Sequence, residues 1–164
     1  MSSARVPRRG KALALGLIAA GCGGDVRATP EGVARAYVSA HFGGDAAGLR
    51  RLWATPADLD ALFTCGPEGE LRVEVARDLD GLIGGLYRWE TEVGFREWDG
   101  KRVWVRSGEA KAGCTARRDV ELERGDVEIA IRNPEHPEWQ PRIEHHGLTM
   151  LRTDHGWRLI EWSP

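Results

Sequence analysis

The sequence contains little that points directly to a chemical activity. Its 164 residues include only 3 cysteines, too few for a disulfide-rich scaffold. The 23 basic side chains do not outnumber the 25 acidic ones, and this balance argues against nucleic acid as a partner. With 41% hydrophobic and 29% charged residues, the composition is that of one soluble domain. It excludes a mostly disordered chain, a fibre and a protein that crosses a membrane several times.

The motifs of several enzyme classes are also missing. There is no Walker A, Gly-x-Gly-x-x-Gly or Gly-x-Ser-x-Gly sequence, so nucleotide use and serine hydrolysis have no support. There is no His-x-His, His-Glu-x-x-His or cysteine–histidine cluster either, and such clusters are the usual ligands of a bound metal. We therefore expect no catalytic residues, no metal site and no cofactor.

The N-terminus has the pattern of a targeting segment. Four basic side chains lie within residues 1–11, and an apolar run follows from Ala12 to Ala20. That run is shorter than the roughly 20 residues needed to cross a bilayer, but it fits a signal peptide. It ends in Ala19-Ala20-Gly21-Cys22, which resembles the lipobox of bacterial lipoproteins, with alanine at position 19 where leucine is usual. The resemblance implies cleavage after residue 21 and a lipid on Cys22; the alternative is an ordinary secretory signal with a chance cysteine.

Cleavage would leave an acidic protein close to a membrane. Residues 22–164 carry 19 basic and 25 acidic side chains, a net charge of −6, so anionic headgroups would not attract this domain. The lipid would therefore hold it in the bacterial cell envelope, facing the periplasm or the cell exterior. We expect residues 22–29 to be a short tether and residues 30–164 to be one domain. The seven residues from Gly23 to Thr29 reach roughly 25 Å at most.

Export would place Cys65 and Cys114 where disulfides form. A bond between them would close a loop of about 50 residues, worth up to ~4 kcal/mol on the chain-entropy model. Two unrelated thiols and a catalytic cysteine are the alternatives, although the sequence has no Cys-x-x-Cys motif.

Helical signals come first in the domain and strand signals follow. Thr29, Asp45 and Thr55 are typical N-caps before helices, and apolar spacing predicts a longer helix over residues 68–90, with a short strand at residues 71–75 as the alternative. From Gly100 on, apolar residues alternate, which predicts strands with turns at residues 124–126 and 153–156 and a proline-containing loop over residues 133–141. This order predicts an α+β fold in which N-terminal helices pack against an antiparallel sheet.

Three segments carry a family resemblance: the opening helix at residues 29–37, Gly43-Gly44-Asp45 before a short second helix, and the closing hairpin at residues 148–160. Together they resemble the nuclear transport factor 2-like superfamily, and within it small bacterial lipoproteins with a single such domain. The resemblance implies a bent sheet wrapped around helices, a cone with a pocket at its wide end, over most of residues 29–162.

Seven tryptophans are candidates for lining such a pocket, although core packing would also explain them. Those on or beside predicted strands are the best candidates: Trp98, Trp104, Trp157 and Trp162, with Trp104 first. His145 is a further candidate. His145 and His146 are neighbours, so on a strand they would point to opposite faces.

The function that these features favour is a lipid-anchored, non-catalytic module that binds a small apolar ligand or an envelope protein, with a homodimer as one possible state. The main alternative is a pocket enzyme of isomerase or dehydratase type, in which His145 or His146 with Asp119 or Glu144 transfers a proton. A third is a docking protein with a filled cone and an exposed sheet face that dimerises. An enzyme would need a buried histidine or tyrosine within hydrogen-bond reach of a carboxylate, facing a cavity.

Overall fold

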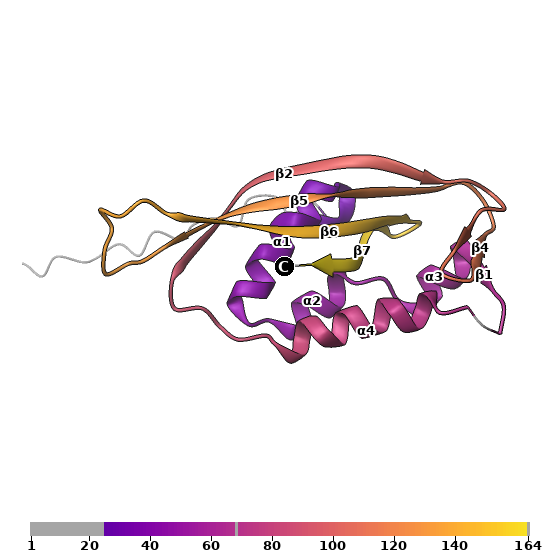
Figure 1. Ribbon diagram of the computed structural model, residues 1–164, viewed down its shortest axis with the longest axis horizontal. Helices are drawn as coiled ribbons and strands as arrows, with labels where there is room; N and C mark the ends of the chain where they lie inside the picture. The colour runs from indigo at the N-terminus through magenta and orange to yellow at the C-terminus, as the bar shows by residue number, and fades with distance from the viewer. Residues whose placement is uncertain (1–24, 68, 164) are drawn as a thin grey trace, which may run out of the picture.

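The computed structural model describes residues 25–67 and 69–163, and within them helices precede most of the strands. The first half holds the 3-10 helix η1 (Val26–Ala28), α1 (Pro30–Gly43), α2 (Ala46–Leu52), α3 (Pro56–Leu62), β1 (Phe63–Cys65) and α4 (Leu71–Gly84). The second half holds β2 (Glu92–Val105), β3 (Ala110–Lys111), β4 (Cys114–Ala116), β5 (Val120–Arg132), β6 (Arg142–Thr153) and β7 (Gly156–Ser163). The α+β class predicted from the sequence is therefore confirmed (Figure 1).

The predicted N-caps start three of the helices. The side chains of Thr29, Asp45 and Thr55 each accept a hydrogen bond from a backbone N–H in the first turn of α1, α2 and α3. The longer helix also forms, so residues 71–75 are helical rather than a strand, but it is shorter than the predicted 68–90. It ends at Gly84, and Gly85 follows, because glycine loses more backbone entropy in a helix than other residues do.

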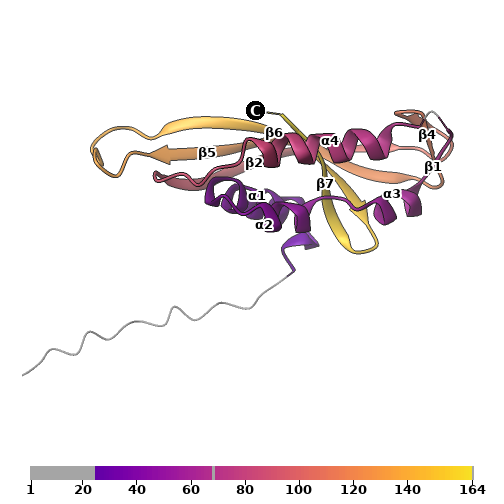
Figure 2. The ribbon, with the colours of Figure 1, turned by 90° about the horizontal axis from the view of Figure 1, so that it is seen from below.

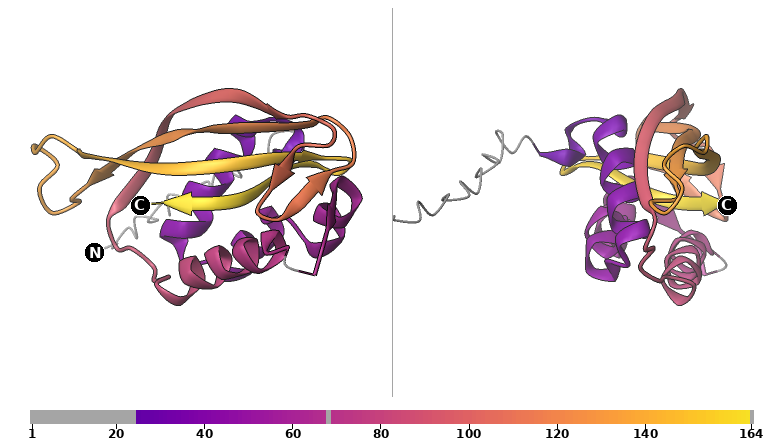
Figure 3. Two further views of the ribbon diagram at one scale, coloured as in Figure 1. Left: turned by 45° about the vertical axis from the view of Figure 1, so that its right-hand side comes forward. Right: turned by 90° about the vertical axis from the view of Figure 1, so that its left-hand side faces the viewer.

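The main sheet is antiparallel with the strand order β2-β5-β6-β7. β2 arches over α1, so the sheet is bent around the first helix (Figure 3). A β-bulge between Phe95 and Glu97 interrupts the register of β2 against β5, and bulges bend the strand that carries them. The β5–β6 connection, which contains the predicted proline loop, projects beyond the rest of the sheet (Figure 1).

The turn predicted at residues 124–126 is wrong. Strand β5 runs straight through it, and Gly125 lies opposite Gly100 of β2. A Cβ atom on residue 125 would lie 2.0 Å from the carbonyl oxygen of Asp99, so this glycine permits a close approach of two strands rather than a turn. The predicted turn at residues 153–156 is confirmed between β6 and β7.

A second, smaller antiparallel sheet has the order β1-β4-β3 and holds the disulfide. Cys65 of β1 lies directly opposite Cys114 of β4, and their sulfur atoms are bonded. The predicted pairing of these two cysteines is confirmed. The bond ties β1, which lies between α3 and α4 in the chain, to β4 in the second half.

Two helices, α1 and α4, pack against the main sheet at different places (Figure 2). α1 packs on one face, where the Tyr37 hydroxyl reaches His146 of β6, and α4 runs beside β7. The indole N–H of Trp53, just after α2, donates to the backbone oxygen of Val75 in α4 at 2.9 Å. The core between these layers is made of fully buried side chains such as Tyr37, Leu49, Ile129 and Met150.

The packed part of the chain begins closer to the N-terminus than predicted. Residues 26–28 lie within the predicted tether but form η1, which contacts α1 and β7. A Cβ atom at Gly32 would lie 2.4 Å from the oxygen of Val26, and one at Gly156 would lie 2.6 Å from the oxygen of Arg27. Two glycines therefore allow η1 to sit directly on the backbone of the domain. Among residues 25–67 and 69–163, no helix is long and apolar enough to pass through a bilayer.

Candidate functional site: an arginine-lined groove beside the first helix

A groove of about 880 Å³ lies between η1, α1 and α2. Its floor includes small and apolar side chains: Val26, Ala36, Ala40 and Leu52. Charged side chains surround the floor: Arg27, Arg50, Arg51, Arg158, Asp25 and Asp45. Four cations and two anions thus line a groove in a chain whose overall charge is negative.

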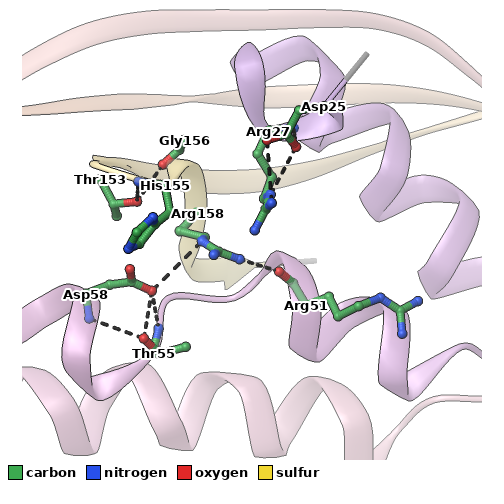
Figure 4. A network of polar contacts seen from close by, with 9 residues as sticks. All are labelled: Asp25, Arg27, Arg51, Thr55, Asp58, Thr153, His155, Gly156 and Arg158. Atoms are coloured by element: carbon green, nitrogen blue, oxygen red, sulfur yellow. Dashed lines mark hydrogen bonds and ion pairs between the residues drawn. The ribbon is translucent and has the colours of Figure 1, made fainter. Parts of the chain in front are cut away.

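Arg158 of β7 is the most buried of these arginines, with 9% of its surface exposed. Its Nη1 donates to the backbone oxygen of Arg51 at 2.6 Å, at the end of α2 (Figure 4). Its Nε lies 3.9 Å from Oδ2 of Asp58 and makes no hydrogen bond, although the atom is buried. The guanidinium is therefore held in place on one side and keeps an unsatisfied donor.

Asp58, the nearest anion to Arg158, is itself fixed by α3. Its Oδ2 accepts hydrogen bonds from the backbone N–H of Thr55 at 2.9 Å and from the Thr55 hydroxyl at 2.8 Å. This capping box anchors the carboxylate at the helix start, so Asp58 cannot turn to form a close pair with Arg158 without breaking the cap.

Arg27 approaches Arg158 from η1 (Figure 4). Its Nε lies 3.0 Å from Oδ1 of Asp25, and the hydrogen bonds from Arg27 lower the pKa of the Asp25 carboxyl. Burial lowers the pKa of Arg158, and the positive charge of Arg27 lowers it further. The two arginines repel each other in the free protein, so a bound anion between them would be favoured electrostatically.

A second hollow, of about 240 Å³, lies on the other side of Arg158. It is lined by residues of α3 and of the β6–β7 turn, among them Asp58, Thr153 and His155. The Thr153 hydroxyl donates to the oxygen of Gly156 at 2.8 Å and accepts from the N–H of His155, which holds the turn in shape. Arg158 lines both hollows and stands between them.

The register of the main sheet places the four predicted tryptophans on one face. Trp98 pairs with Val127 and Trp104 with Glu121, while Trp157 and Trp162 pair with β6 residues of that same face. Their environments differ. Trp157 is 2% exposed and belongs to the core, whereas Trp104 is 45% exposed with Arg106 above its ring. The hollow of about 400 Å³ lined by Val103 and Val105 lies on the opposite face from Trp104.

The other two tryptophans make specific contacts. Trp98 is half-buried and its Nε1 donates to Oε1 of Glu123 at 2.6 Å. Trp162 is half-buried beside His41 and His146, at 6.1 and 6.2 Å between ring centroids, and its buried Nε1 makes no hydrogen bond.

His146, rather than the selected His145, lies on the tryptophan face. His145 pairs with Glu128 and its side chain is exposed on the other face, as the alternation of a strand requires. His146 is buried, its Nδ1 lies 2.8 Å from the Tyr37 hydroxyl, and its Nε2 lies 3.6 Å from Oε2 of Glu144. The rings of Phe42 and His41 pack against it at 5.7 and 5.4 Å between centroids.

Burial keeps this cluster uncharged at neutral pH. Burial, together with the smaller effect of the neighbouring His146, lowers the pKa of His41 to about 4. Burial also lowers the pKa of His146, against the opposing effect of Glu144. Burial raises the pKa of Tyr37. The buried Nδ1 of His41 makes no hydrogen bond.

The sequence did not identify Arg158, at the centre of the groove, or Tyr37, at the centre of the buried histidine cluster. Tyr37 and Arg158 match no catalytic or binding motif, and Arg158 lies between Trp157 and Leu159 in the predicted closing hairpin. No local signal marks Arg158, because it is buried beside the place where Trp53 and Ala54 pair with Leu159 of β7, and that contact joins segments over a hundred residues apart.

Comparisons with known proteins give limited information. No family model matches the sequence, and no similar curated protein is found. A solved structure with structural similarity is described as a putative calcium/calmodulin-dependent protein kinase type II association domain from Thiobacillus denitrificans ATCC 25259. It is 20% identical, the alignment covers 83% of this chain and 94% of that chain, and the TM-score is 0.40. A likeness at this level assigns this chain neither a family nor a ligand.

Proposed function

We propose that this protein is a lipid-anchored, non-catalytic binding module of the bacterial cell envelope, attached through Cys22 and binding its ligand in the groove beside η1. One observation carries the proposal: η1, which begins four residues after Cys22, forms a wall of that groove. The helices enclosed by a bent antiparallel sheet also support the resemblance to the nuclear transport factor 2-like superfamily.

The position of η1 brings the groove near the anchor. Three residues lead from Cys22 to Asp25, a distance of at most about 11 Å for an extended chain. A lipid on Cys22 would therefore keep the groove close to the membrane surface, where envelope ligands and partner proteins, including a second copy of this chain, are concentrated.

General acid–base catalysis is a second candidate function, and one observation favours it. Glu144, His146 and Tyr37 form a row in space. Oε2 of Glu144 lies 3.6 Å from Nε2 of His146, and Nδ1 of His146 lies 2.8 Å from the Tyr37 hydroxyl. However, the rings of Phe42 and His41 pack against the His146 ring, and none of these residues lines the groove. The packing supports a structural role for the row, and we therefore favour binding.

Cell fractionation tests the anchor. In a bacterial host, the full chain should fractionate with membranes, and Cys22→Ala should release it from the membrane fraction. The variant Ala19→Leu, which restores the usual lipobox residue, should keep membrane attachment and serves as the control. If Cys22→Ala remains in the membrane fraction to the same extent, or if mass spectrometry finds no lipid on the native chain, the anchored function is wrong.

A further inference from the structure

We infer that the groove beside η1 binds a single-chain anionic amphiphile, with its carboxylate or phosphate between Arg158 and Arg27 and its alkyl chain on the floor formed by Val26, Ala36, Ala40 and Leu52. This inference rests on the proposed binding function and names the chemical class of its ligand.

The arginine pair supplies the anion site. Arg158 is nine-tenths buried and carries a buried Nε–H that no described acceptor reaches, and an unmade hydrogen bond from a charged donor is costly. Asp58 lies 3.9 Å away and is committed to the α3 cap, so it neutralises Arg158 only in part. An anionic oxygen beside Arg158 and Arg27 would relieve the repulsion between the two cations and balance the charge that Asp58 neutralises only in part.

The floor supplies the apolar half of the site. Ala36 and Ala40 lie one helical turn apart on α1, and Leu52 closes α2 beside them. Val26 of η1 is 50% exposed at the groove, although most large apolar side chains of the domain are buried. An alkyl chain against Val26 and these small residues would remove that surface from water.

Charge sets the sign of the ligand. The groove carries four arginines against two aspartates, while residues 22–164 have a net charge of −6. Asp25 and Asp45 are each engaged by an arginine, at 3.0 Å to Arg27 and 3.6 Å to Arg51. With these two pairs counted, the groove still holds two more cations than anions, so an anionic ligand is favoured over a cationic one.

Size favours a small amphiphile over a protein partner. The groove of about 880 Å³ falls within the roughly 300–1,000 Å³ typical of small-molecule sites. A stable protein interface needs a broader surface, about 800 Å² on each partner. We therefore assign the groove to a small ligand, and a protein partner would have to use another face.

The decisive experiment is isothermal titration calorimetry of the full chain carrying Cys22→Ala against four probes. The substitution removes the lipid site and so avoids the use of detergent. The probes are octyl phosphate, octanoate, octanol and inorganic phosphate. Octyl phosphate and octanoate should bind at least about tenfold more tightly than octanol, because each ionic hydrogen bond is worth about 1.4 kcal/mol or more. Inorganic phosphate should bind at least about tenfold more weakly than octyl phosphate, because it cannot use the apolar floor.

Matched variants locate the site without disturbing Arg158, whose loss would leave the buried Asp58 unpaired. Arg27→Gln should weaken octyl phosphate about tenfold and leave octanol unchanged. Arg96→Gln removes the same charge from Arg96 of β2, which pairs with Glu128 of β5 on the surface. This control variant should leave the affinity for octyl phosphate unchanged. Val26→Ser should weaken octyl phosphate about fivefold, whereas Val73→Ser on the exposed face of α4 should not.

Three results would overturn the inference: equal affinity for octyl phosphate and octanol, equal affinity for octyl phosphate and inorganic phosphate, or equal effects of Arg27→Gln and Arg96→Gln. None of these would affect fractionation of the lipidated chain with membranes. The anchored function therefore stands or falls separately from the identity of the ligand.

Discussion

The Tyr37 hydroxyl lies 2.8 Å from Nδ1 of His146, and this buried hydrogen bond joins α1 to β6 across a sequence separation of 109 residues. Removing the hydroxyl leaves a buried ring nitrogen without a partner, which costs about 1–3 kcal/mol. Tyr37→Phe should therefore lower the free energy of unfolding by that amount in urea titrations. Tyr87→Phe, at an exposed tyrosine, should be neutral; equal effects of the two variants would contradict the structural role of this bond.

The two histidines of this cluster should make stability depend on pH. Their pKa values in the folded protein, about 4 for His41 and a lowered value for His146, lie below the ordinary 6.5. Below pH 6.5 the unfolded chain binds more protons, so stability is full above that pH and is lost as the pH falls towards the folded-state values. Between pH 6.5 and 5, the free energy of unfolding should fall by at most about 1.4 kcal/mol per pH unit for each histidine.

The variant pair His41→Gln and His146→Gln isolates this effect. Urea titrations between pH 5 and 7 should show the slope in the parent chain and a much smaller one in the double variant. His136→Gln, at an exposed loop histidine, should retain the parent slope. An unchanged slope in the double variant would assign the acid sensitivity to other groups.

The disulfide should account for a large part of the domain's stability. The bond between Cys65 and Cys114 closes a loop with a sequence separation of 49, which is worth about 4 kcal/mol on the chain-entropy model. The double variant Cys65→Ser and Cys114→Ser should unfold at correspondingly lower urea, and reductant should shift the parent chain to the same midpoint. Peptide mapping without reductant should recover the two segments joined; two free thiols would refute the bond.

The packing of η1 against Gly156 can be tested with the variant Gly156→Ala, which adds one methyl group. Gly156 has φ +93° and a Cβ there would lie 2.6 Å from the oxygen of Arg27, whereas Gly108 has φ +84° with open space around it. Both alanine variants share the backbone strain of about 1–3 kcal/mol, but only Gly156→Ala should displace η1. Hydrogen exchange of the Arg27 and Ala28 amides should accelerate in Gly156→Ala alone; equal exchange in both variants would mean that η1 does not depend on this contact.

Local signals predicted the helices well because each N-cap acts within its own first turn. Thr29, Asp45 and Thr55 all act as expected. The strands were predicted less well. The start of β2 at Glu92 was missed, because the bulge after Phe95 breaks the alternation of apolar residues, and Gly125 was taken for a turn when its partner is Gly100. Strand pairing over such distances depends on tertiary contacts that a local pattern does not contain.

The candidate sites could be predicted only in part for the same reason. The alternation of a strand correctly separates His145 from His146, but nothing local tells which of them meets Tyr37. The groove requires η1, α2 and β7 to converge on Arg158, and these elements are distant in the sequence. Residue type alone identified Cys65 and Cys114, because assigning Cys22 to the lipid leaves two cysteines with only one intramolecular pairing.

With a lipid on Cys22, the packing of η1 would also limit how far the domain lies from the membrane. A fully extended segment from Cys22 to Thr29 would reach about 25 Å, but with η1 packed on Gly32 and Gly156 the reach from Cys22 to Asp25 is at most about 11 Å. The body would then have little room to rise or swivel, and any partner would have to come to it within a thin layer above the lipid. With a lipid on Cys22, a methyl group at residue 32 or 156 that displaced η1 would more than double this reach, to about 25 Å.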